Sequence, residues 1–253
     1  MRAIIVAAGM GRRLAPHTDD RPKCMVDVGG KSILERQIDA YRKAGVADIA
    51  IVRGYLADKI RLPSVTYFEN ADYRKNNILA SLFRAEAAME GGFLFSYSDI
   101  VFRPSVVQAL VAARGDYGLV VDRQWHKAYV GRTLHPESEA ELARVAAGRV
   151  LAVGKRVVER ADAHGEFIGL ARFSSRAAVR MRAEYRALER RLGLDAPFGT
   201  APRFEMAYLT DLLNHLISSG EELRSVDIDG GWREIDTPQD LERAREIVSS
   251  VEW

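Results

Sequence analysis

The sequence has few residues that could form disulfides or bind a metal through sulfur or imidazole. It has one cysteine, Cys24, among 253 residues, which excludes an intramolecular disulfide and a thiolate metal cluster. Its five histidines are scattered without His-x-x-x-His spacing, so a zinc site is not expected. No apolar run approaches a membrane span, and the run Ile4–Ala8 is too short for a signal peptide. We therefore expect a soluble, cytoplasmic protein.

An excess of charge of one sign is also lacking. Lys and Arg number 37 and Asp and Glu 35, so the net charge is only +2. This balance argues against a nucleic-acid coat or a polybasic membrane surface, and we expect neither nucleic acid nor a membrane as partner. With 47% hydrophobic residues and no Pro-, Gly- or Ser-rich linker, the chain can bury one sizeable core. One domain spanning 1–253 is predicted, with a helical insertion near 175–203 as an option.

The first hundred residues alternate apolar runs with helical patterns. Ile4–Ala8 is an unbroken apolar run, which is typical of a strand buried on both faces. A helix is expected over 32–44, since Ser32 and Glu35 have the spacing of a capping box. Further strands are expected at 48–52, 65–69 and 93–97, with a helix at 77–89. This alternation predicts right-handed crossovers and a parallel sheet.

The second half of the chain is less regular. Strands are expected at 118–121, 149–153, 166–173 and 223–228, and helices at 175–191, 204–219 and 240–248. The whole pattern predicts a Rossmann-like three-layer α/β/α fold with a mixed, mainly parallel sheet. Ligands of such sheets gather at the carboxyl ends of the strands, which places Gly9, Gly54 and Asp99 at one edge.

The loop Ala7-Ala8-Gly9-Met10-Gly11-Arg12-Arg13 after the first strand suits a phosphate group. Glycines let backbone N–H groups turn toward phosphate oxygens, and the arginines add fixed positive charge. The dinucleotide fingerprint is incomplete, because Leu14 stands where its third glycine belongs. Lys23 follows in Arg21-Pro22-Lys23, a segment that alone would be an ordinary solvated loop.

Taken together, these segments resemble the signature of the sugar nucleotidyltransferase superfamily. The shared pattern is Ala-Ala-Gly-x-Gly-x-Arg, then Pro-Lys, then Gly-Lys at 30–31. The resemblance implies the nucleotide-diphospho-sugar transferase fold, a loop that wraps a triphosphate, and a lysine that neutralises charge in the transition state. Arg12 and Lys23 are the catalytic candidates. The expected nucleotide-binding residues are Ala7, Ala8, Gly9, Gly11, Arg12, Lys23, Gly54, Asn77, Ser81 and Ser98.

A second set of residues resembles the phosphocholine and phosphonate cytidylyltransferase branch of that superfamily. Its members are Glu69-Asn70, Tyr73, Asn76-Asn77 and Ser81-Leu82. Asn and Ser at a helix start are also ordinary N-caps. An amide both donates to and accepts from a pyrimidine edge, so Asn77 is expected at the base with Ser81 close by. The resemblance thus implies CTP as the nucleotide.

Three acidic residues are candidates for binding Mg²⁺. Asp99 ends a buried strand, where an unpaired carboxylate is costly. Glu234 and Asp236 are two residues apart in an extended segment, so both side chains point to one face. That segment, Trp-Arg-Glu-Ile-Asp-Thr-Pro, resembles the superfamily's second metal segment, although Thr237 and Pro238 also fit a helix start. The resemblance implies an oxygen cage for Mg²⁺.

The acceptor pocket is expected in the second half. Trp125, Tyr129 and Phe167 would contribute to a cage for a quaternary ammonium, whereas Asp122 or Glu166 would pair with a primary amine. Phe167 is equally well explained as core. Lys155 is a candidate for the acceptor phosphate or phosphonate. The full set of expected acceptor residues is Asp122, Trp125, Tyr129, Arg132, Lys155, Glu166 and Phe167.

The implied reaction joins CTP to a small phosphorylated or phosphonate acceptor and releases pyrophosphate. Phosphocholine, 2-aminoethylphosphonate and related phosphonates all fit as acceptors. One alternative is a sugar-1-phosphate or inositol-1-phosphate nucleotidyltransferase, against which Asn76-Asn77 argues. Another alternative is a non-catalytic nucleotide-binding regulator. The joint presence of candidate catalytic and metal-binding residues argues against it, namely Lys23, Asp99, Glu234 and Asp236. A homodimer is a further option.

Overall fold

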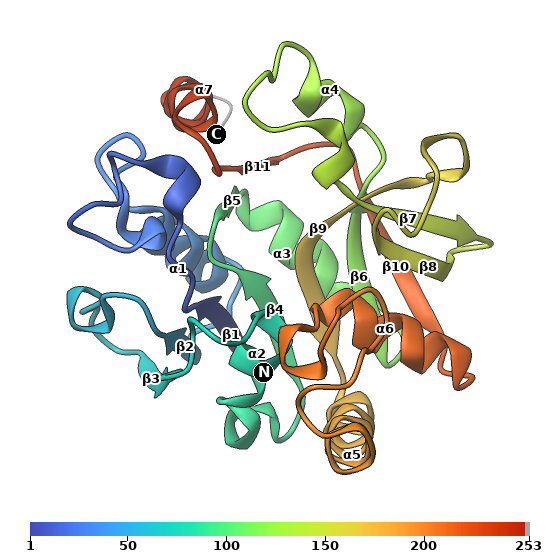
Figure 1. Ribbon diagram of the computed structural model, residues 1–253. Helices are drawn as coiled ribbons and strands as arrows, with labels where there is room; N and C mark the ends of the chain where they lie inside the picture. The colour runs from blue at the N-terminus through green and yellow to red at the C-terminus, as the bar shows by residue number, and fades with distance from the viewer. Residues whose placement is uncertain (251–253) are drawn as a thin grey trace.

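A nine-stranded mixed sheet forms the centre of the computed structural model, which describes residues 1–250 (Figure 1). The strand order is β3-β2-β1-β4-β9-β6-β10-β8-β7. These strands are β1 (Arg2–Ala7), β2 (Ile49–Arg53), β3 (Thr66–Glu69), β4 (Phe93–Tyr97), β6 (Tyr117–Asp122), β7 (Glu141–Ala146), β8 (Arg149–Lys155), β9 (Gly165–Phe173) and β10 (Leu223–Ile228). A separate antiparallel pair joins β5 (Ile100–Phe102) to β11 (Trp232–Glu234).

Most strands of the large sheet share one direction. β1 is parallel to β2 and β4, β2 to β3, and β6 to β10. β9 is antiparallel to β4, β6 and β7, and β8 is antiparallel to β10 and β7. Only β9 and β8 therefore run against the rest of this sheet within residues 1–250. The predicted mixed, mainly parallel sheet is confirmed.

Helices cover both faces of the sheet. Alternating side chains of β1 enter different cores, because Ile5 packs with Leu34 of α1 while Ile4 packs with Leu79 of α2. α1 (Ile33–Lys43) and α3 (Pro104–Ala112) lie on the first face, and α2 (Ile78–Phe83), α5 (Ser175–Leu192) and α6 (Leu209–Ser218) lie on the second. The three-layer α/β/α prediction is confirmed.

Two further helices lie near the carboxyl edge of the sheet. They are α4 (His126–Tyr129) and α7 (Pro238–Val248), which are drawn above the sheet in Figure 1. Short 3₁₀ turns occupy Arg12–Leu14, Lys23–Met25, Ala57–Lys59, Glu86–Met89, Glu137–Glu139, Arg160–Asp162 and Phe204–Met206. No helix within residues 1–250 has both the length and the apolar composition needed to cross a membrane.

Helix starts follow the sequence signals closely. The Ser32 side chain accepts from the Glu35 N–H at 3.2 Å, and the Glu35 carboxylate accepts from the Ser32 N–H at 2.7 Å. Thr237 and Asp240 form the equivalent capping box at α7, with Pro238 in its first turn. The start at Ser32 is confirmed, and α7 begins at Pro238, where Thr237 and Pro238 fit a helix start, two residues before the expected range. The start of α7 fixes the segment that carries Glu234 and Asp236.

Two expected helices are shorter than their patterns indicate. α2 stops at Phe83 instead of continuing to residue 89, and α6 starts at Leu209 instead of residue 204. After Phe83 the chain continues in tight turns, in which the N–H groups of Arg84 and Ala85 donate to the carbonyls of Ser81 and Leu82. The late start of α6 has a different cause, which is a contact with the start of α2. The N–H groups of Asn77 and Leu79 donate to the carbonyls of Glu205 and Ala207, at 3.0 and 3.2 Å. The chain before α6 therefore runs beside α2 as an irregular segment.

The predicted helical stretch at 175–191 is α5, a long helix packed on the sheet. Its buried residues Ala177, Met181, Tyr185 and Leu188 belong to the same apolar cluster as Phe93 of β4. Tyr185 stacks on Phe83 with ring centroids 3.6 Å apart. The apolar stripe of α5 thus adds to the main core of the described chain.

The strand register gathers distant residues at one edge. β1 and β4 end side by side, which places Gly9 and Asp99 together. β9 starts at this edge, since Glu166 pairs with both Asp122 and Leu142. Glu141 lies opposite Lys155 in the β7–β8 pairing. Residues from the first and second halves of the chain therefore meet at the carboxyl edge.

Candidate active site

A pocket of about 340 Å³ opens at the carboxyl edge of the sheet. It is lined by the loop after β1, the start of α2, the β4–β5 junction, β7–β9 and the segment around β11. Most of the expected site residues line it, namely Ala7, Ala8, Gly9, Gly11, Lys23, Asn77, Ser81, Ser98, Asp99, Lys155, Glu166, Phe167, Glu234 and Asp236. The structure thus brings together residues that the sequence separates by more than 200 positions.

The glycine loop lies directly against the lysine. Gly11 has a φ of 60°, and a Cβ at this position would lie 2.6 Å from the Cβ of Lys23. Any larger residue would therefore displace the lysine as well as strain the loop. Thr18 fixes the loop by donating to the Gly11 carbonyl at 3.1 Å. Gly54 supports it from behind, since a Cβ there would lie 2.7 Å from the Ala8 carbonyl oxygen.

Lys23 joins two carboxylates of the pocket. Its Nζ lies 3.0 Å from Asp99 Oδ2 and also contacts Asp236 Oδ1. Burial by itself would lower the pKa of Lys23, but the negative charges of Asp99 and Asp236 outweigh it and raise this pKa. The ammonium is therefore a permanent positive charge at the centre of the site.

Arg13, rather than the expected Arg12, faces the pocket. Its Nη2 lies 2.5 Å from Asp236 Oδ2, and Arg13 lines the pocket wall. Arg12 is exposed, with its guanidinium 3.7 Å from Met10 Sδ. Burial would raise the pKa of Asp236, but Lys23, His135 and Arg13 together hold this pKa far below its ordinary value.

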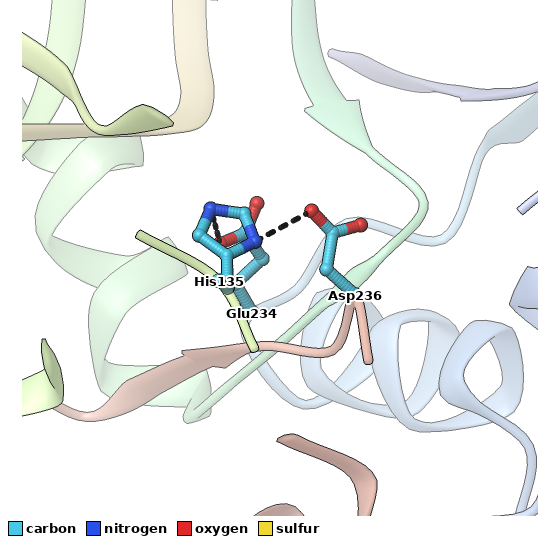
Figure 2. Close-up of side chains that lie close together, drawn as sticks. All are labelled: His135, Glu234 and Asp236. Atoms are coloured by element: carbon cyan, nitrogen blue, oxygen red, sulfur yellow. Dashed lines mark ion pairs between the residues drawn. The ribbon is translucent and has the colours of Figure 1, made fainter. Parts of the chain in front are cut away.

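A buried histidine joins the two acidic residues of the segment after β11. His135 Nδ1 lies 3.1 Å from Asp236 Oδ2, and Nε2 lies 3.6 Å from Glu234 Oε2 (Figure 2). Potential ligand atoms of these three residues all lie within 4.8 Å of one another. Asp99 reaches this group through Lys23. The structure therefore brings the predicted metal residues to one place and adds a histidine that the sequence did not indicate.

Arg132 holds the acidic segment in place and does not line the pocket at the carboxyl edge. Its guanidinium lies 2.9 Å from Glu234 Oε2 and 2.7 Å from Asp240 Oδ1. Burial and the charge of Asp236 raise the pKa of Glu234, and Arg132 opposes this shift. Arg132 thus connects Glu234 to the capping box of α7.

Asp122, an expected acceptor-binding residue, instead forms hydrogen bonds that hold the segment around β11. Its Oδ1 accepts from the N–H groups of Gln124 and Gly230, both at 2.9 Å. Its Oδ2 accepts from Trp232 Nε1 at 2.8 Å. These bonds fasten the start of β11 to the end of β6. Asp122 therefore positions the strand that carries Glu234.

Glu166 presents an unpaired carboxylate oxygen in the part of the pocket where the acceptor was expected. Tyr129 donates to its Oε1 at 2.8 Å. The other oxygen, Oε2, is buried and has no hydrogen-bond partner in the part of the chain that the structure describes. Burial, followed by the charge of Glu234, raises the pKa of Glu166 well above its ordinary value. A cation at Oε2 would satisfy this carboxylate.

The predicted aromatic cage is only partly present at the pocket wall. Phe167 lines the pocket, but Trp125 and Tyr129 pack behind it in a cluster with Leu142 and Val158. The rings of Trp125 and Tyr129 meet edge to face, 5.8 Å apart. These two aromatic residues support Glu166 from behind.

Several polar residues of the acceptor end escaped the sequence analysis. Tyr97 donates to Glu141 Oε2 at 3.0 Å, and Lys155 Nζ lies 3.2 Å from Glu139 Oε2. Burial raises the pKa of Glu141 to about 7, although Lys155 opposes the shift. One signal was available: Tyr97 directly precedes Ser98-Asp99 at the end of a predicted strand. Gly169 makes room for it, since a Cβ there would lie 2.1 Å from the Tyr97 ring.

The expected base-reading residues lie at the start of α2, on another wall segment of the same pocket. Asn77 and Ser81 both line it. Ser81 donates to the Asn77 carbonyl at 3.0 Å and accepts from Asn70 Nδ2 at 2.8 Å. Asn77 Nδ2 donates to the Met206 carbonyl at 3.1 Å. The side-chain oxygen of Asn77 is the group that remains to meet a ligand donor.

The fold is that of known nucleotidyltransferases. A solved structure of CTP:phosphocholine cytidylyltransferase from Streptococcus pneumoniae superposes with a TM-score of 0.72 and 21% identity, covering 98% of this chain and 99% of that one. The inositol-1-phosphate CTP transferase from T. maritima superposes with a TM-score of 0.75 and 22% identity, covering 99% and 97%. The expected α/β fold of nucleotide-diphospho-sugar transferases is thereby confirmed.

Sequence comparison gives the family. Residues 3–168 match the MobA-like NTP transferase domain. A CTP:phosphoglutamine cytidylyltransferase from Campylobacter jejuni is 35% identical over 253 residues, which is 96% of this chain and 98% of that protein. A 2-aminoethylphosphonate cytidylyltransferase from Lancefieldella rimae is 39% identical over 98 residues, 37% of this chain and 40% of that protein. This chain belongs to the MobA-like NTP transferase family and is a nucleotidyltransferase, as the resemblance implied.

Proposed function

We propose that the protein transfers CMP from CTP to a small phosphorylated or phosphonate acceptor that carries a primary ammonium group. The similarity to cytidylyltransferases supports CTP as donor and a phosphorus oxyanion as acceptor. The observation that carries the acceptor class is the buried, unpartnered Oε2 of Glu166 in the pocket of the described chain. Acceptors of this class include 2-aminoethylphosphonate and phosphoglutamine.

The reaction exchanges one P–O bond for another. An oxygen of the acceptor phosphate or phosphonate attacks the α-phosphorus of CTP and forms a new P–O bond. The bond from the α-phosphorus to the bridging oxygen breaks, and its electron pair leaves with pyrophosphate. The acceptor oxygen is already anionic at neutral pH, so no side chain has to remove a proton. The protein's work is therefore positioning and charge stabilisation.

Lys23 and Arg13 supply the positive charge. Both contact Asp236, and Lys23 also contacts Asp99. Once these carboxylates have another counterion, the ammonium of Lys23 is free to meet a phosphate oxygen. Gly11 holds the lysine next to the glycine loop, where backbone N–H groups suit a triphosphate. Charge that develops toward pyrophosphate would thus meet a fixed cation.

Nucleotidyltransferases of this family generally use a divalent metal ion. We propose Mg²⁺, held by Asp99, Glu234 and Asp236. The donors fit, because carboxylate oxygens are the ligands that Mg²⁺ prefers. Asp99 Oδ1 is also buried without a hydrogen-bond partner within residues 1–250. When bound, the ion would offset negative charge on the reacting phosphates.

The acceptor end favours an ammonium with N–H groups over a quaternary ammonium. A primary ammonium donates a hydrogen bond to Glu166 Oε2, whereas a trimethylammonium group has no N–H to donate. The aromatic surface that would replace this bond is reduced, because Trp125 and Tyr129 pack behind the pocket. Sugar or inositol phosphates lack a cation and would leave Glu166 unsatisfied. A cytoplasmic location and a homodimer stay predictions.

The test is pyrophosphate release from CTP with Mg²⁺ and matched acceptors. The sharpest pair is 2-aminoethylphosphonate against ethylphosphonate, which differ only in the amino group. We expect kcat/KM to be at least about 100-fold higher for the amine, and higher for the amine than for phosphocholine. Equal rates for the matched pair would refute the ammonium site. No pyrophosphate from CTP with any of these acceptors or with phosphoglutamine would refute cytidylyl transfer itself.

A further inference from the structure

His135 is a buried histidine without an obvious structural reason for its place. Its side chain is 1% exposed, and neither ring nitrogen has a hydrogen-bond partner within residues 1–250. Burying a polar ring in this way is costly unless a partner satisfies it. Both nitrogens face carboxylates, Nδ1 toward Asp236 and Nε2 toward Glu234 (Figure 2).

The loop that carries His135 is fastened to the acidic segment. Gln239 Oε1 accepts from the N–H groups of Thr133 and Leu134, at 2.9 and 3.3 Å. Its Nε2 donates to the Gly131 carbonyl at 3.0 Å. Gln239 lies in the first turn of α7, three residues after Asp236. The histidine and the carboxylates are therefore held by one small framework.

Arg132 makes the same framework rigid from the other side. It bonds to Asp240, whose carboxylate caps α7, and to Glu234. The loop is thus tied to α7 through both a side-chain amide and a guanidinium. Ligands held in place before a metal arrives bind it more tightly than flexible ones.

The spacing of the three residues suits a metal ion. Ligand atoms of His135, Glu234 and Asp236 lie within 4.8 Å of one another. Ligands at about 2.0–2.2 Å from a first-row metal are separated by roughly 3–4.4 Å, so small side-chain movements would close the site. An imidazole nitrogen suits transition metals, whereas Mg²⁺ favours oxygen ligands.

We propose that His135 is a metal ligand that forms, with Glu234 and Asp236, a mixed nitrogen–oxygen site for a first-row divalent transition cation such as Mn²⁺. Its catalytic meaning rests on the proposed nucleotidyl transfer, but metal binding is measured without nucleotide or acceptor. Failure of either idea is therefore visible separately. The imidazole nitrogen would make the site bind Mn²⁺ more tightly than Mg²⁺, and the same two carboxylates would serve either cation.

The direct test is spectroscopic and needs no variant. Metal-free protein is loaded with substoichiometric Mn²⁺, and electron spin-echo modulation is recorded for ¹⁴N coupled to the ion. We expect a ¹⁴N modulation typical of a directly bound imidazole. Wild-type protein that binds Mn²⁺ with no ¹⁴N coupling would overturn the proposal, because the histidine would then only neighbour the carboxylates.

A pair of variants tests whether His135 makes the site prefer Mn²⁺ over Mg²⁺. His135→Gln removes the imidazole, and His126→Gln removes an exposed histidine from the preceding helix as a matched control. We expect His135→Gln to weaken Mn²⁺ binding about tenfold or more, to abolish the ¹⁴N signal, and to change Mg²⁺ affinity less than about threefold. The control should match wild type in each measurement. Equal Mn²⁺ affinities for His135→Gln and wild type, with melting temperatures showing both folded, would refute the role of His135.

Discussion

The two halves of the sheet build their parts of the pocket in different ways. In the half formed by β3, β2, β1 and β4, all pairings are parallel, and the glycine loop, Gly54 and Ser98-Asp99 directly follow strands. In the half formed by β9, β6, β10, β8 and β7, most pairings are antiparallel and the polar residues lie within or beside the strands. The first half holds the nucleotide candidates, and the second holds the acceptor candidates.

This difference shows which parts of the site can be predicted from the sequence and which depend on strand pairing. Gly11 and Lys23 lie twelve positions apart in one continuous motif and are in contact, so a short stretch of sequence carries this part of the site. Where the acceptor is expected, Glu141 lies opposite Lys155 and Glu166 lies opposite Leu142, because antiparallel registers align β7 with β8 and β9. A shift of one residue in either register would turn these side chains to the other face. The acceptor site is therefore a property of strand pairing.

The largest effect is expected in the nucleotide half. Lys23→Ala should lower kcat about 1000-fold, because it removes the buried cation that faces the developing charge. Lys31→Ala is the matched control, since Lys31 is exposed and pairs with Asp39 on the surface. Its kcat should stay within about twofold of wild type. Steady-state pyrophosphate release with saturating CTP measures both, and full activity of Lys23→Ala would disprove the assigned role.

The next effect should appear in the acceptor half. Glu166→Gln keeps the size of the side chain but removes its charge, so kcat/KM for an ammonium acceptor should fall about 100-fold. The KM for CTP should change less than about threefold, because the base and triphosphate candidates lie elsewhere in the pocket. Glu159→Gln, at an exposed position, is the control. Equal losses for 2-aminoethylphosphonate and ethylphosphonate would show that Glu166 does not bind the amine.

Much of the nucleotide half could be predicted from sequence. The loop after β1, both capping boxes and the convergence of Asp99, Glu234 and Asp236 near Lys23 all agree with local patterns. Secondary structure was also predicted well where one strand or helix explains each pattern. It was predicted less well at α2, which gives way to tight turns after Phe83, and at α6, whose start is displaced by hydrogen bonds to the start of α2.

Three features could not be predicted, for physical reasons. His135 lies at the metal candidates because Gln239 holds its loop, and nothing near His135 in sequence indicates that clamp. Trp125 and Tyr129 look like binding aromatics but pack behind Glu166, since burial depends on the fold of the loop. Glu141 belongs to β7, a strand with no strong pattern of its own. Each case depends on a partner far away in sequence.

A smaller effect is expected on the free energy of unfolding, through Glu141 in the half that holds the acceptor candidates. Burial raises the pKa of Glu141 from 4.5 to about 7, with Tyr97 and Lys155 as its polar neighbours. The folded state holds the proton more tightly than the unfolded state, so the free energy of unfolding falls as pH rises from 4.5 to 7. Between pH 5 and 8 this loss should be about 2 kcal/mol.

Glu141→Gln should remove that pH-dependent loss. The variant cannot ionise at this position, so its stability relative to wild type should increase as pH rises. Urea unfolding at pH 5 and pH 8 measures the difference. Glu137→Gln, which removes a surface partner of Arg160, should leave the wild-type pH dependence in place. The same decline in Glu141→Gln as in wild type would show that another group causes it.

The smallest effect separates two neighbouring arginines within the nucleotide half. The sequence pattern favours Arg12, but Arg13 is the residue whose guanidinium contacts Asp236 at 2.5 Å and lines the pocket. Arg13→Ala should lower kcat about tenfold, since one partly exposed charge is lost near the triphosphate candidates. Arg12→Ala should change kcat less than about twofold, because its side chain is exposed beside Met10. A larger loss in Arg12→Ala would mean that the loop turns when CTP binds and exchanges the two arginines. Measuring kcat and KM for both variants would therefore show whether the loop already has its nucleotide-bound arrangement in the free protein. If it does not, binding of CTP decides which arginine contacts the triphosphate, even in the half of the sheet that sequence predicts better.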